Sequence, residues 1–224
     1  MATFLMSQLV ADARIAVQDL GVLATPRFAD AQILSLANQT LKAMAVLRPD
    51  LFALVTTMTT VQGAYQTAPA DSIRFMEALL VVGANNLNEI NREALDLMSN
   101  NWQTLTPTTP TNWMRHPRNA NAFFTYPPAA AGITLQIEYA QSPPFYALTQ
   151  APAIMPDAYY STLLDGTVAR LEMTDNEASN SGRAKLMNDM FVSQLQTSLQ
   201  ARNTLDNESG GGTDDIASPP GAVT

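Results

Sequence analysis

Residues 113–146, the most strand-like passage of the chain, constrain the fold most. Within this passage, residues 133–139 (Ile-Thr-Leu-Gln-Ile-Glu-Tyr) alternate apolar with polar side chains, which predicts a strand with one apolar face and one wet face. Such a strand is typical of antiparallel pairing. Residues 123–126 predict a second strand and residues 127–132 a turn. Because helical patterns flank this passage, we expect helices to cover its apolar face.

Apolar residues at helical spacing predict long helices elsewhere in the chain. Thr25 is the expected N-cap of the second helix, with Pro26 at its first position, where the missing N–H costs nothing. Gly166 lies inside the third helix at a cost of about 1 kcal/mol relative to alanine. It therefore indicates either close approach of another element or a bend. The four expected helices span about residues 4–20, 26–48, 156–173 and 183–202.

The segment between the second and third helices, about residues 51–146, is rich in strand-forming residues. Residues 55–61 predict a strand that continues through Gln62 and Gly63 into a hairpin with residues 64–66. Residues 73–82 fit either a buried strand or a short helix, and we favour the strand. Asn91 is the expected cap of a short helix over residues 92–98.

These patterns predict an α+β fold: a four-helix bundle with an inserted small antiparallel β-sheet or sandwich, and an extended C-terminal tail. At 224 residues one domain is the default, with two small lobes as the alternative. We assign residues 1–202 to a single domain and residues 203–224 to an extended acidic arm.

Composition excludes several classes of function. The net charge is −8 and charged residues make up only 14% of the chain, which argues against a protein that grips nucleic acid by neutralising phosphates. Sparse charge fits surfaces shared with other subunits, or equally a merely neutral surface. The absence of cysteine excludes disulfides and fits synthesis inside a cell. The apolar runs are too short for a membrane span, and the N-terminal residues do not predict a signal peptide.

The sequence offers no reaction centre. It contains none of the phosphate-binding, dinucleotide-binding or nucleophile motifs. The one histidine, His116, fits a surface turn, and the acidic residues around Glu172 fit a solvated helix end better than a metal site. We therefore expect no enzyme, cofactor or metal. The basic stretch of residues 115–118 is too short for a nucleic-acid footprint, although it could contact an acidic neighbour.

Trp102 and Trp113 flank a loop rich in proline and threonine. They could stack on a sugar, as in a carbohydrate-binding module, but packing between helices and sheet is the favoured interpretation.

The last segment, residues 203–224, carries four acidic residues, no basic residue, three glycines in its middle and a Pro-Pro pair. This composition gives the segment little reason to pack on its own domain. We therefore expect it to bind a partner subunit. The expected partner-binding residues are Asp214, Asp215, Ile216, Pro219, Pro220 and Val223.

The order of these features resembles the head-to-tail adaptor proteins of short-tailed and related bacteriophages. The resemblance rests on the Leu-Arg-Pro-Asp passage at residues 47–50, the Val/Thr-rich stretch, Ala-Pro-Ala-Asp at 68–71, Tyr-Pro-Pro with small residues and a glycine at 126–132, and the Pro-Asp start of a helix at 156. It covers roughly residues 25–199. Gly166 departs from the bulkier residue expected there.

The resemblance implies a structural virion protein without catalytic residues. It implies a homo-oligomeric ring, usually a dodecamer, at the head–tail junction of the virion, assembled from subunits made in the cytoplasm of the host bacterium. The expected partners are the portal protein and a tail tube or nozzle protein, with genomic DNA passing through the channel unbound and no membrane involved. Another tail component, such as a tube or nozzle subunit, is the alternative.

Overall fold

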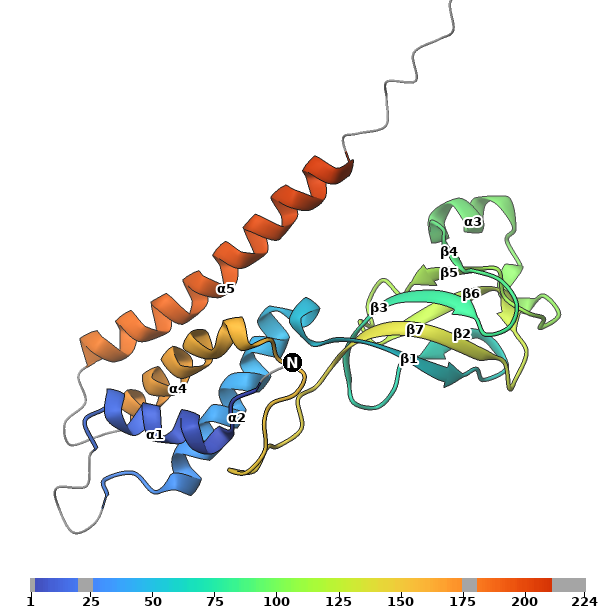
Figure 1. The fold of residues 1–224 in the computed structure, drawn as a ribbon. Coiled ribbons are helices and arrows are strands. Elements are labelled where there is room, and N and C mark those ends of the chain that lie inside the picture. The colour runs from blue at the N-terminus through green and yellow to red at the C-terminus, as the bar shows by residue number, and fades with distance from the viewer. Residues whose placement is uncertain (1–2, 20–25, 175–180, 211–224) are drawn as a thin grey trace, which may run out of the picture.

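The chain folds into two parts, each with its own hydrophobic core (Figure 1). The computed structural model describes residues 3–19, 26–174 and 181–210. The helical part contains α1 (Met6–Ala16), α2 (Asp30–Leu47), α4 (Tyr160–Thr174) and α5 (Ser181–Gly210). The β part, residues 53–141, contains all the described strands and α3 (Arg92–Met98). Three short 3₁₀ helices complete the described elements: η1 (Pro49–Phe52), η2 (Trp102–Thr104) and η3 (Asp157–Tyr159).

Two small sheets build the β part, so the α+β class is confirmed. One sheet has the strand order β1-β7-β3 and the other β2-β6-β5-β4. Their bounds are β1 Ala53–Thr59, β2 Gly63–Thr67, β3 Ser72–Val81, β4 Asn88–Glu89, β5 Asn112–Arg115, β6 Ala122–Ala129 and β7 Thr134–Gln141.

The alternating strand is confirmed as β7, whose Leu135, Ile137 and Tyr139 are buried. The expectation that helices would cover its apolar face is wrong. The two sheets cover each other: Phe75 on β3 stacks on Phe123 of β6, with ring centroids 4.2 Å apart. Each sheet has one apolar face, so pairing the two faces satisfies both without the helices.

The predicted hairpin of residues 55–66 is also wrong. β1 pairs with β7 and β2 with β6, so the chain changes sheets between them. Thr60 fixes this crossing: its N–H donates to the carbonyl of Ile133 (2.8 Å), and its hydroxyl donates to the carbonyl of Ala130 (2.7 Å). The 130–133 turn therefore takes the bonds that a hairpin partner would have used.

β3 confirms the strand favoured for residues 73–82, but it is irregular. Its pairing with β7 shifts register three times, between Ser72 and Arg74, Phe75 and Glu77, and Ala78 and Leu80. Each shift is a β-bulge, which places two residues opposite one. Buried side chains consequently recur every third residue along β3, rather than every second. The short helix after Asn91 is confirmed as α3, with the Asn91 side chain accepting from the N–H groups of Glu93 and Ala94.

The structure does not show the four-helix bundle that we expected. α4 packs against α1, α2 and α5, whereas α5 lies mainly on α4 and its C-terminal turns extend past it (Figure 1). α1 is shorter than the expected helix over residues 4–20. α5 is longer than the expected helix over residues 183–202, and its backbone stays helical through residues 203–210. The remaining residues of the expected arm, 211–224, lie outside the described residues.

Gly166 marks a close approach of α4 to α2 and α5. A Cβ built on Gly166 would lie 2.6 Å from Cγ2 of Thr40 on α2 and 2.7 Å from Cδ2 of Phe191 on α5. Real Cβ atoms do not approach so closely, so only glycine lets these three helices meet here. This resolves the two interpretations of Gly166 in favour of close packing, and it explains the departure from a bulkier residue.

Arg48 joins the helices to the start of the β part. Only 3% of Arg48 is exposed, and its guanidinium donates two hydrogen bonds to the Asp50 carboxylate, at 2.8 and 2.7 Å. A third hydrogen bond runs to the carbonyl of Leu195 on α5, at 2.9 Å. The hydrogen bonds to Asp50 raise the pKa of Arg48, which stays charged. The Arg-Pro-Asp passage therefore ends α2, begins η1 and attaches α5.

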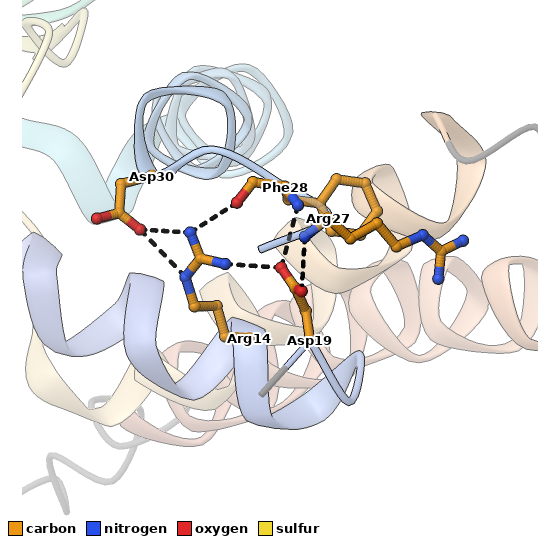
Figure 2. Close-up of polar contacts among 5 residues, drawn as sticks. All are labelled: Arg14, Asp19, Arg27, Phe28 and Asp30. Carbon is orange, nitrogen blue, oxygen red and sulfur yellow. Dashed lines mark hydrogen bonds and ion pairs between the residues drawn. The ribbon is translucent and has the colours of Figure 1, made fainter. Parts of the chain in front are cut away.

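A charged network fixes the start of α2 to the end of α1 (Figure 2). Arg14 donates to Asp19 (2.6 Å), to Asp30 (2.5 Å) and to the carbonyl of Phe28 (2.6 Å). Asp19 also accepts the N–H groups of Arg27 (2.8 Å) and Phe28 (3.0 Å).

This network explains where α2 begins. Pro26 is not its first residue: Ala29 occupies the N-cap position, because the bonds to Asp19 hold the preceding residues outside the helix. Thr25, the expected cap, lies outside the described residues.

This network lowers the pKa of Asp19. Burial acts in the opposite direction, but it is outweighed by the N–H groups of Phe28 and Arg27 and by the charge of Arg14. A carboxylate with a lowered pKa stabilises the fold above its unfolded pKa of about 3.9, and this contribution disappears as the pH falls through the folded value.

We predict that Gly166→Ala lowers the free energy of unfolding by about 1–2 kcal/mol, because overpacking outweighs the gain of about 1 kcal/mol in helix propensity. Urea unfolding followed by circular dichroism measures the change. Ser161→Ala, at an exposed position of α4, is the control and should be nearly neutral. A stabilised Gly166→Ala variant would contradict the close packing.

We predict that Asp19→Asn destabilises the protein by about 1–3 kcal/mol at pH 7, because two backbone N–H groups and Arg14 lose a charged acceptor. The difference from the wild type should shrink as the pH falls from 5 toward 2. Urea titrations at pH 7, 5 and 3 measure it, with Asp189→Asn on α5 as the control. A difference that stays constant with pH would show that the charge of Asp19 is not the cause.

Candidate functional site

His116 supports a turn. Its Nδ1 accepts the N–H groups of Arg118 (3.1 Å) and Asn119 (2.8 Å), and its ring stacks on Phe124. Because Nδ1 is an acceptor in both bonds, the imidazole orders the loop between β5 and β6. Glu172 pairs with Arg183 at 3.4 Å, and the two other acids of that cluster, Asp175 and Glu177, lie outside the described residues. Within the described ranges no group of three or more metal-ligating side chains occurs.

Both tryptophans are buried, at 1% and 0% exposure, so neither presents a face on which a sugar could stack. Trp102 packs against Phe124 and donates its indole N–H to Asp96 of α3 at 2.6 Å. Trp113 lies between the two sheets against Phe75. The packing interpretation is therefore confirmed for both side chains, but within the β part rather than between it and the long helices.

A basic hollow of about 330 Å³ lies where β3 meets the loop between β5 and β6. Arg74, Arg115 and Arg118 line it, with Phe75 and Pro117 among its apolar residues and no acidic residue in its lining. Arg115 pairs with Glu89 outside the lining, at 2.7 Å. The structure gives the guanidinium groups of Arg74 and Arg118, both exposed, no carboxylate partner among the described residues.

Sequence patterns identified only the part of this hollow that residues 115–118 form. Residues 115–118 stood out as a basic stretch, but Arg74 belongs to a distant strand. The hydrogen bond from the N–H of Phe75 to the carbonyl of Ala120 (2.8 Å) brings that strand to the loop. No local pattern around Arg74 signals this contact.

A second hollow, of about 550 Å³, has the opposite charge and lies between α1 and the start of α4. Asp12 and Asp157 line it, beside Phe4 and Tyr160. The Tyr160 hydroxyl donates to Asp12 at 2.5 Å, and burial followed by this bond raises the pKa of Tyr160. Hydrogen bonds from the backbone and hydroxyl of Thr3 lower the pKa of Asp157. Asp12 thus ties α1 to α4, and Asp157 ties η3 to a residue that precedes α1.

Two further surfaces expose apolar groups. Leu97 and Met98 at the end of α3 are 90% and 86% exposed. β1 forms the edge of its sheet: its seven residues carry no charge, pair with β7 in unbroken register, and are exposed or half-exposed throughout. Subunits that assemble through contacts rather than chemistry commonly display such groups.

The expected partner-binding residues cannot be placed on any of these surfaces. Asp214, Asp215, Ile216, Pro219, Pro220 and Val223 all lie outside the described residues. They follow α5, whose last described residue is Gly210. Among the helices that the structure describes, none combines the length and hydropathy needed to cross a bilayer.

The model of the family described as SU10 adaptor protein matches residues 5–213. The match includes every described helix and strand of the helical and β parts. No curated protein matches the sequence. The chain therefore belongs to the SU10 adaptor protein family, a family of bacteriophage head-to-tail adaptors.

Proposed function

We propose that this protein forms a ring beneath the portal of the phage head, where it joins the head to the tail and lets the genomic DNA pass. The family match over residues 5–213 is the observation that carries the proposal. It supports a structural role in the virion for a subunit made in the host bacterium. The surfaces of the described residues, two charged hollows and exposed apolar groups, support action through contacts with other subunits.

The charge of the chain suits a passage for DNA. A ring of many copies, each with a net charge of −8, carries a total charge of order −100 if it is a dodecamer. Such a ring repels phosphates over a Debye length of roughly 8 Å at physiological salt. The duplex would therefore slide without binding.

The C-terminal arm is the proposed link to the portal. Beyond Gly210 the acidic pair Asp214–Asp215 precedes the apolar residues Ile216 and Val223. Because a few buried anchors carry most of the energy of an interface, we assign the grip on the portal mainly to the strongly apolar Ile216 and Val223 and to the Pro219–Pro220 pair. The tail tube or nozzle protein would bind elsewhere on the ring.

We predict that the purified protein assembles into rings, alone or on addition of its portal, and that these rings bind duplex DNA undetectably. Mass photometry and electron microscopy measure the ring, and fluorescence anisotropy at 50 and 200 mM salt measures DNA binding. Open tubes of stacked rings would favour a tail-tube subunit instead. Tight, salt-sensitive DNA binding would contradict the sliding passage.

We predict that removing residues 211–224 leaves folding unchanged and abolishes docking on the portal, because the described helices and strands all remain. Circular dichroism and co-sedimentation with portal test the two halves of this prediction. Ile216→Ser with Val223→Ser should weaken docking at least tenfold, whereas Ala222→Ser, the matched control in the arm, should not. Normal docking of the truncated protein would remove the arm from the mechanism.

A further inference from the structure

We propose that the basic hollow of the β part is a carboxylate-binding site, and that its ligand is the acidic pair Asp214–Asp215 of the C-terminal arm. The site would hold the arm on the adaptor itself until the portal competes for it. The assignment adds a second contact for the arm and does not depend on ring formation.

The hollow has the chemistry that a pair of carboxylates requires. Arg74 and Arg118 supply guanidinium groups, whose planar fork matches a carboxylate with two parallel hydrogen bonds. Arg115 is already engaged by Glu89. The two remaining guanidinium groups would match the two adjacent carboxylates of the arm. Phe75 and Pro117 give the hollow apolar walls, against which Ile216 would lie next to the acids.

Charge also selects the arm as the occupant. Acidic residues outnumber basic ones in the chain, 20 against 12, whereas the hollow is lined by three arginines and no acid. The arm has the opposite charge, since residues 203–224 contain four acidic residues and no basic one. Duplex DNA is a poorer candidate, because the net charge of −8 repels it.

Covalent attachment through α5 would strengthen a contact that is weak for a free peptide. Asp214 follows the last described residue, Gly210, by four positions, a reach of up to roughly 14 Å, and two more glycines precede it. Exposed ion pairs contribute only about 0–1 kcal/mol each, so a free peptide would bind weakly. A short tether that spans the distance raises the effective concentration to about the millimolar range, which is enough to occupy a weak site.

Disulfide trapping in the full-length chain tests the site, and the natural absence of cysteine gives a clean background. Ala120→Cys places a thiol in the hollow, and Ala217→Cys places one in the arm. With oxidised glutathione at low salt, this pair should crosslink at least fivefold more than the control pair Gln32→Cys with Ala217→Cys, in which Gln32 is exposed on α2. The band would migrate as a monomer if the arm reaches its own hollow and as a dimer if it reaches a neighbour's, and either result supports the site.

Charge variants decide whether the arginines are responsible. Arg74→Glu with Arg118→Glu, or Asp214→Asn with Asp215→Asn, should reduce the crosslink to the control level, and 0.5 M salt should reduce it severalfold. Lys42→Glu with Lys185→Glu makes the same change in net charge outside the hollow and should leave the crosslink unchanged. Circular dichroism checks that each variant folds. A crosslink no stronger than the control pair, or one that survives both arginine substitutions, overturns the proposal.

Discussion

The connection between the two parts of the molecule depends on the buried guanidinium of Arg48. It binds Asp50 at the point where the chain leaves α2 for the β part, and it binds the carbonyl of Leu195 within α5. Removing one partner of such a buried charged pair costs about 3–5 kcal/mol, far more than an exposed pair contributes. The arrangement therefore ties the start of the β part to α5, the helix that leads to the C-terminal arm.

Local sequence patterns predicted the elements whose structure depends on neighbouring residues. The alternation in residues 133–139 identified β7, and the Asn91 side chain identified α3, because both signals come from neighbouring residues. β3 was ambiguous for a physical reason. Its repeated bulges give buried residues a period of three, which matches neither a regular strand nor a helix.

Contacts between distant residues were not accessible from the sequence. Nothing near Thr60 shows that its hydrogen bonds go to the 130–133 turn, so the crossing between sheets was mistaken for a hairpin. The basic hollow was not predicted for the same reason, since Arg74 and Arg118 come together only through tertiary contacts. Gly166 could be recognised as unusual, but its partners Thr40 and Phe191 could not be named. The family resemblance indicated the structural role because it used the order of elements over most of the chain.

The exposed edge of β1 has a consequence for an isolated copy of the subunit. Natural edge strands are usually protected by lysine, proline, a bulge or very short length, and β1 has none of these over its seven residues. An isolated copy therefore offers an open template for unwanted strand addition. The template remains until another surface covers β1, so an isolated copy is prone to aggregate through this edge.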